Sequence, residues 1–165
     1  MKIFLIECLI ICAIFTIIVV TMAKKMSPLD YIYDYPQPII DRCYELGLIK
    51  EKPEPGHKSV LKKKMLVVAI LGIPLGFFAY YVNHADTFLQ GFLTVYGIAV
   101  VVCVYDVLLD ITWFCHDKSL IIPGTEDLTD SYHDYMFHVR ASLRGLLLTL
   151  PAGIAAGITV YLIAR

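Results

Sequence analysis

Residues 3–22 read IFLIECLIICAIFTIIVVTM, a run in which Glu7 is the only charged residue. A helix that crosses a bilayer needs about 20 such residues, because the hydrocarbon core is about 30 Å thick. The hydrophobic content of the chain is 58%, which is high for a soluble protein and predicts an integral membrane protein. Three further apolar stretches of similar length lie at about residues 65–82, 88–112 and 145–163.

These stretches predict an all-α fold. We expect an integral membrane four-helix bundle with an additional amphipathic interfacial helix, organised as a single membrane domain over residues 1–165. The longest segment outside the stretches, about residues 24–64, is too short to form a core of its own without disulfides or metal. Within it, Pro38 and Gly47 predict a short helix over residues 39–46, because proline suits a helix start and glycine a helix end.

The distribution of charge predicts the topology. Of the 14 Lys and Arg residues, nine lie in residues 24–64 and three in residues 114–144, which leaves Lys2 and Arg165 for the other side. Lys and Arg concentrate in cytoplasmic loops, so both long segments are expected inside and both termini outside. The first stretch is interpreted as a retained span, because it exceeds the roughly 7–15 apolar residues of a signal peptide.

Basic residues beside the predicted spans are expected to contact a lipid bilayer with anionic headgroups. Residues 50–64 have the Pro, Gly and charge content of a linker, and they end in three lysines directly before the second span. Each charge near an anionic surface contributes roughly 1 kcal/mol. For the two arginines before the fourth span, a helix dipole or a phosphate-bearing substrate are alternatives. The residues concerned are Lys62, Lys63, Lys64, Arg140 and Arg144.

The segment before the fourth span predicts an amphipathic helix from Thr125 to about Leu143. Pro123 and Gly124 indicate a turn, and Thr125 then suits the N-cap position. Such a helix is expected to lie along the membrane surface. Its apolar face would comprise Leu128, Tyr132, Tyr135, Met136, Val139 and Leu143, and its polar face Asp127, Asp130, Asp134 and His138.

Asp106 and Asp110 are the two candidate catalytic residues. They lie one helical turn apart, on one face of the third span. Ionisable residues inside a span are costly and are functional candidates by default. Two carboxylates at this spacing can share a proton or bind a cation. The alternative is that the helix leaves the hydrocarbon near Val104, so that both carboxylates are hydrated.

A divalent metal site at the cytoplasmic rim is a further hypothesis. Asp134 and His138 are one turn apart, a spacing that can place two ligands on one metal ion. The polar face of any surface helix would show the same pattern, so a hydrated face is the alternative interpretation. His138, or else His133, is expected to complete the acid pair. The predicted ligands are Asp106, Asp110, His133, Asp134 and His138.

Several motifs together resemble a family of small multi-pass membrane proteins of clostridial bacteria. They are the run from Asp106 through DVLLDITWFCHDK, then IPGTED, the Tyr-His-Asp-Tyr-x-Phe-His pattern, and the Tyr35-Pro36 segment. The resemblance covers about half of the chain. No activity is established for that family, so the resemblance implies only a bacterial inner-membrane location.

Three classes of function are left open by the sequence. The favoured one is a binding or accessory component that handles an ion or small solute through a polar site at the cytoplasmic rim. The second is an intramembrane metal- or acid/base-dependent enzyme that uses Asp106 and Asp110. The third is a structural partner subunit of a larger membrane complex or a homo-oligomer. Nucleic-acid binding is not expected, because the basic residues lie beside the spans and form no basic fold.

Overall fold

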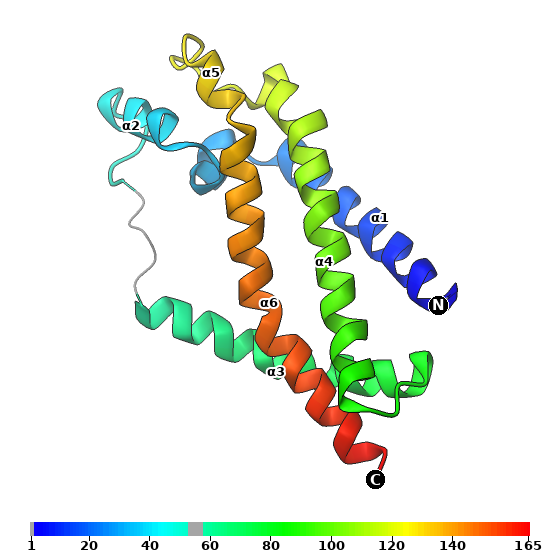
Figure 1. The fold of residues 1–165 in the computed structure, drawn as a ribbon. Helices are drawn as coiled ribbons and strands as arrows, with labels where there is room; N and C mark the ends of the chain where they lie inside the picture. Colours follow the sequence, from blue (N-terminus) through cyan, green and yellow to red (C-terminus); the bar gives the residue numbers. More distant parts are fainter. Residues whose placement is uncertain (1, 53–57) are drawn as a thin grey trace.

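The computed structural model describes residues 2–52 and 58–165, which form six α-helices and three short 3-10 helices (Figure 1). No strand occurs in these two ranges, so the all-α prediction is confirmed. Four helices are long and apolar enough to cross a membrane, as predicted. Part of the predicted linker, residues 53–57, lies outside the described residues. The four long helices are α1 (Lys2–Lys25), α3 (Lys58–Asn83), α4 (Phe88–Thr112) and α6 (Tyr135–Ile163).

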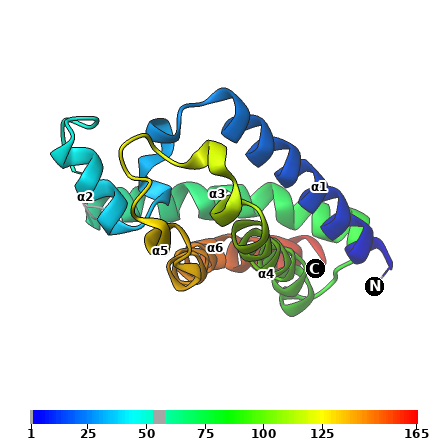
Figure 2. The same ribbon diagram turned by 90° about the horizontal axis from the view of Figure 1, so that it is seen from above.

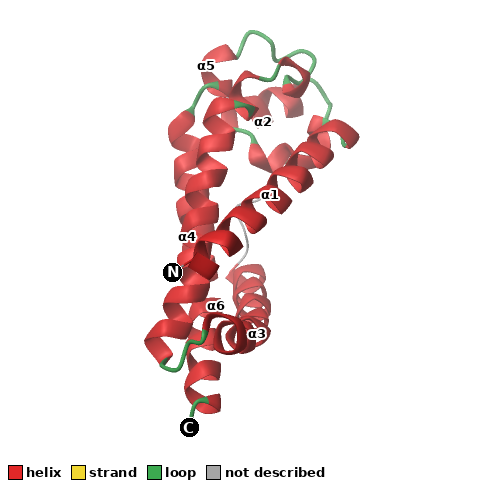
Figure 3. Ribbon diagram, turned by 90° about the vertical axis from the view of Figure 1, so that its right-hand side faces the viewer, coloured by secondary structure: helices red, strands yellow, loops and turns green. Residues whose placement is uncertain are grey.

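Helices α3, α4 and α6 meet at one end of the molecule, and α4 and α6 also pair near the other end. Helices α4 and α6 lie side by side, and α3 crosses them at a steep angle (Figures 1 and 2). Helix α1 runs at an angle to the α4–α6 pair (Figure 3), and it contacts α4 more than α3. The arrangement is therefore more splayed than the bundle that the sequence predicts. We call the end with the α3–α4 turn, residues 84–87, the hairpin end.

Small residues determine how closely the helices approach at the hairpin end. A Cβ atom on Gly76 of α3 would lie 2.6 Å from Cβ of Thr159 and 2.8 Å from the Ala156 carbonyl oxygen of α6. On α6, a Cβ atom on Gly157 would lie 2.7 Å from the Phe88 carbonyl oxygen of α4. Small residues let helix backbones come into direct contact. The three helices are therefore closed against one another at this end.

At the other end, residues 28–49 and 114–132 pack together into a unit that we call the cap (Figure 1). It includes the 3-10 helices η1 (Pro28–Asp34), η2 (Phe114–His116) and η3 (Lys118–Leu120), and helices α2 (Gln37–Glu45) and α5 (Thr129–Tyr132). The short helix predicted over residues 39–46 corresponds to α2. The buried core draws on both segments and comprises Ile32, Tyr35, Ile39, Ile40, Cys43, Ile122 and Tyr132.

Hydrogen bonds between buried groups hold the cap together. The Tyr35 hydroxyl donates to the Leu120 carbonyl oxygen at 2.7 Å. The Tyr132 hydroxyl accepts from the Ile122 amide at 2.9 Å and lies 2.6 Å from the Thr125 hydroxyl. Neither segment is long enough for a core, but the two together form one, which the sequence analysis did not anticipate.

The predicted interfacial helix over residues 125–143 is wrong as a separate element. The chain forms the short α5, turns at His133, and then begins α6, which continues without interruption into the predicted fourth span. The turn has a local cause: Asp134 Oδ1 accepts a hydrogen bond from the Phe137 amide at 3.0 Å and starts a new helix. The predicted polar and apolar faces are also wrong. His138, expected on the polar face, is 5% exposed, whereas Met136, expected on the apolar face, is 54% exposed.

Candidate functional site

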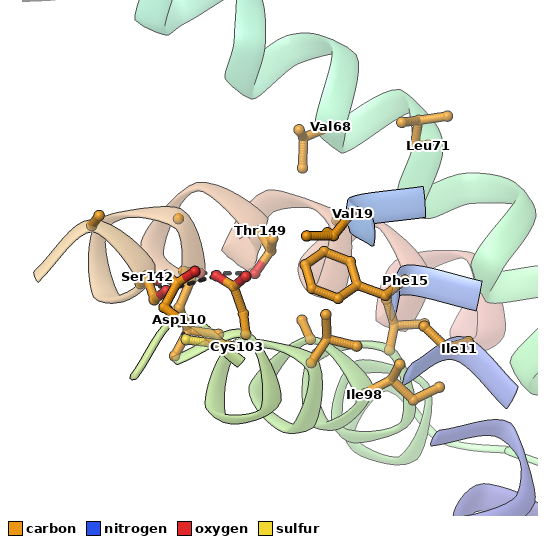
Figure 4. A pocket seen from close by; sticks show the side chains of 18 of the residues that line it. Ile11, Phe15, Val19, Val68, Leu71, Ile98, Cys103, Asp110, Ser142 and Thr149 are labelled. Atoms are coloured by element: carbon orange, nitrogen blue, oxygen red, sulfur yellow. Dashed lines mark hydrogen bonds between the residues drawn. The ribbon is translucent and has the colours of Figure 1, made fainter. Parts of the chain in front are cut away.

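A cavity of about 970 Å³ lies among the four long helices, with Tyr33 and Asp34 of η1 at its cap side. Ligand pockets are commonly about 300–1,000 Å³, so this cavity is large enough for a small molecule. Its wall is mostly apolar. Figure 4 shows Phe15 of α1 pointing into the space between Ile98 of α4 and Val68 of α3.

The end of the cavity near the cap is polar. Asp110 Oδ2 of α4 lies 2.9 Å from His138 Nδ1 of α6. One turn away, the Ser142 hydroxyl donates to Asp106 Oδ2 at 2.9 Å. Figure 4 shows Asp110 and Ser142 together at this end. The helical period thus places Asp106 and Asp110 on one face, as the sequence predicts, and α6 supplies a partner for each.

His138 occupies a buried position between aromatic rings. Its ring centroid lies 5.7 Å from that of Phe114 and 5.3 Å from that of Phe137. The rings limit its movement, and the bond to Asp110 fixes the direction of Nδ1. The Cys115 thiol lies next to His138, and Cys115 is also buried, at 6% exposure. The sequence predicts His138 as a partner of the acid pair, on a polar helix face; in the structure it lies beside Asp110 and is buried.

Asp34 is a site residue that the sequence analysis did not select. It ends η1 and lines the cavity together with Asp106, Asp110 and His138. Its side chain is exposed to solvent at the edge of the cavity, and neighbouring protein groups also lie around it. Burial raises the pKa of Asp34, the negative charge of Asp110 raises it further, and His138 opposes the shift. The available signal was a carboxylate between Tyr33 and Tyr35, in the segment that follows the first span.

The predicted five-residue metal site is not assembled. The Asp134 carboxylate accepts a hydrogen bond from an amide at the start of α6. The centroid of the His133 ring lies 5.1 Å from that of the His116 ring. Within residues 2–52 and 58–165, no group of three or more His, Cys, Asp or Glu side chains is arranged to hold a metal ion. The break between α5 and α6 is the physical reason, because it removes His133 from the helix face that carries His138.

The residues predicted to contact lipid headgroups lie outside this site. All of them are exposed, three near the start of α3 and two on the first turns of α6. Their exposure is compatible with headgroup contact, and these five residues do not line the cavity. They are Lys62, Lys63, Lys64, Arg140 and Arg144.

A fourth carboxyl group lines the cavity near the hairpin end. Asn83 Nδ2 of α3 donates to both oxygens of Glu7, at 3.0 and 3.2 Å, and Glu7 is 9% exposed. Among the described residues that line the cavity, the charged types are thus four acids and His138, with neither Lys nor Arg. In the sequence, Glu7 stands out as the one charged residue of the first apolar stretch, and no local pattern connects it with the other acids.

The chain matches no protein-family model, no curated protein and no solved structure. The fold and the site themselves define a helical protein with four apolar helices of membrane-spanning length and, among them, a mostly apolar cavity that carries four acids. What the site can bind follows from the chemistry of its own residues.

Proposed function

We propose that this chain is a multi-pass protein of the bacterial cytoplasmic membrane that binds a small, positively charged ion or solute in its cavity. The observation that carries this proposal is the composition of the described lining, which includes four carboxyl groups and one imidazole but no Lys or Arg. The polar end formed by Asp34, Asp106, Asp110 and His138 is the proposed binding site. The protein acts as a binding or accessory component in this proposal.

The carboxyl groups at the polar end are unequally compensated. Asp110 has an imidazole partner at 2.9 Å, whereas Asp106 receives a neutral hydroxyl at the same distance. Asp34 has no hydrogen bond or ion pair within the described part of the chain. An ionised carboxylate beside an apolar wall is costly unless a proton or a cation compensates it. A cationic solute would provide this compensation, and an anion would increase the repulsion.

The orientation in the membrane is part of the proposal. We infer that the cap faces the cytoplasm, with both termini outside. Twelve of the 14 Lys and Arg residues lie in residues 24–64 and 114–144, which supports this orientation. The exposed lysines and arginines beside α3 and α6 would then contact anionic headgroups. In a cysteine-free background, Asp86→Cys should react with an impermeant thiol reagent in intact cells. Labelling of Asp130→Cys instead would reverse the assignment.

The test of cation binding uses the purified full-length chain and isothermal titration with ethylammonium, Na⁺ and Mg²⁺, with acetate as the anionic control. At least one cation should bind and acetate should not. Asp106→Asn should weaken binding at least tenfold, and Asp34→Asn should weaken it as well. Asp130→Asn is the matched control, because it removes an exposed carboxylate of the cap outside the cavity. Binding that Asp106→Asn and Asp34→Asn leave unchanged, or no binding of any cation, would overturn the proposal.

An acid/base enzyme is the second candidate, and the Asp110–His138 pair favours it. A carboxylate that orients an imidazole at a cavity wall is a common arrangement for proton transfer. In that case a bound solute would be recovered chemically altered, and Asp110→Asn or His138→Gln would abolish the alteration. Recovery of the unchanged solute, measured by mass spectrometry, would favour the binding protein.

A further inference from the structure

We infer that the ligand of the cavity is a single-chain amphiphile with an ammonium headgroup. The headgroup would lie among Asp34, Asp106 and Asp110, and the alkyl chain would extend along the apolar wall toward the hairpin end. This inference rests on the proposed function and specifies the ligand class of the same site.

The shape of the cavity favours an elongated ligand. On α4, lining residues extend from Thr94 to Asp110, and these 16 helical steps correspond to roughly 24 Å at 1.5 Å per residue. Between the polar end and Glu7, the wall is mostly apolar on all four helices, with Thr94 and Thr149 as its polar side chains. It includes Leu146 of α6 and, as Figure 4 shows, Phe15 of α1, Leu71 of α3 and Ile98 of α4. A small hydrophilic cation would leave most of this wall without contacts, whereas an alkyl chain would fill it.

The charges determine the headgroup. A neutral headgroup would leave the partly buried Asp106 with only a neutral hydroxyl as its partner. A carboxylate or phosphate would require Lys or Arg, and neither occurs among the described lining residues. His138 is the remaining basic group, and Asp110 already engages it at 2.9 Å. A zwitterionic phospholipid would place its phosphate beside the acids. The chemistry therefore selects a headgroup with a positive charge and no accompanying negative charge.

The test compares probes by native mass spectrometry of the full-length protein released from maltoside micelles. Dodecylammonium should bind at least tenfold more tightly than ethylammonium. Dodecanoate, dodecanol and phosphatidylethanolamine should not displace it. Asp106→Asn should weaken dodecylammonium binding at least tenfold, which separates site binding from partition into the micelle.

A second pair of variants tests the alkyl chain separately. Ala99 lines the cavity, so Ala99→Phe should weaken dodecylammonium binding while ethylammonium binding stays unchanged. Val104 lies on the outer side of the same helix and is 56% exposed, so Val104→Phe is the matched control and should have no effect.

The outcomes separate this inference from the proposed function. Equal binding of ethylammonium and dodecylammonium would overturn the amphiphile and leave the cation site intact. Preferential binding of phosphatidylethanolamine would overturn the single-chain ligand in favour of a membrane lipid. Binding of dodecanol as tight as that of dodecylammonium would overturn both proposals, because the acids would then play no part. Failure of every cationic probe to bind would do the same.

Discussion

The two halves of α6 pack in opposite ways. Near the hairpin end, Ala152, Gly153, Ala156 and Gly157 are all buried against α3 and α4. Near the cap, the polar side chains of His138 and Ser142 face the cavity and pair with Asp110 and Asp106 of α4. The helix is continuous through both halves, so the difference comes from side-chain size and polarity. Small residues bring α3 against the hairpin half of α6, whereas polar side chains join the other half to α4 beside the cavity.

Two glycines illustrate this difference. A Cβ atom on Gly153 would lie 3.0 Å from Tyr96 Cβ, whereas a Cβ atom on Gly145, two turns earlier, would meet nothing within 4 Å. The first glycine permits close contact with α4. The second faces the cavity, where no such contact exists. A glycine in a helix therefore does not by itself predict a close contact between helices, because the position of the neighbouring helix decides it.

The largest expected effect on stability is at the hairpin end, where the helices are in close contact. Gly76→Ala forces a methyl group against Thr159 and Ala156 of α6, and it should lower the free energy of unfolding by about 1–3 kcal/mol. Gly145→Ala is the matched control. It should leave stability unchanged or raise it by up to about 1 kcal/mol, because alanine favours a helix. Unfolding in detergent, followed by circular dichroism, measures both. Equal losses for the two variants would refute the difference between the halves.

The cap end should depend on hydrogen bonds more than on close backbone contact. Tyr35→Phe removes the bond to the Leu120 carbonyl oxygen and leaves that buried oxygen without its donor. We expect a loss of about 1–2 kcal/mol in the free energy of unfolding. Tyr33→Phe is the control, because Tyr33 is 69% exposed. If the two variants unfold at the same denaturant concentration, the Tyr35 bond does not stabilise the cap.

Asp34 should make the stability of the cap depend on pH. Its pKa is raised above the ordinary value of 3.8, so its favourable contribution is complete below pH 3.8 and is lost as the pH rises through the folded-state pKa. Asp34→Asn should therefore raise the melting temperature at neutral pH, and the difference should vanish in acid. Thermal unfolding of both proteins across this pH range is the measurement. A variant that is less stable than the wild type at neutral pH would contradict the raised pKa.

The smallest expected effect concerns the exposed link between the two cap segments. Arg42 Nη2 donates to Asp127 Oδ2 at 3.1 Å, and both side chains are partly exposed to solvent. Exposed ion pairs contribute about 0.2–1 kcal/mol and are screened by salt. Arg42→Ala should reduce stability within that range at low salt, and less at high salt. A loss as large as that of Tyr35→Phe would mean that the surface link, and not the buried core, holds the cap.

Local properties of the sequence determined the elements of this fold. Hydropathy and length identify four helices that can cross a membrane, because both are properties of consecutive residues. Pro38 and Gly47 bracket α2 for the same reason, and Gly47 adopts φ 71° at the helix end. The helical period alone places Asp106 and Asp110 on one face.

Only the tertiary structure decided what those elements enclose. The bond from Tyr35 to Leu120 joins residues 85 positions apart, so no local pattern predicts the core of the cap. Asp34 faces Asp110 and His138 only because the cap brings η1 over the cavity. The burial of His138 likewise depends on α4, since the local pattern places that residue on a polar face. Periodicity records which side chains share a face, but the neighbour that covers the face comes from a distant part of the chain.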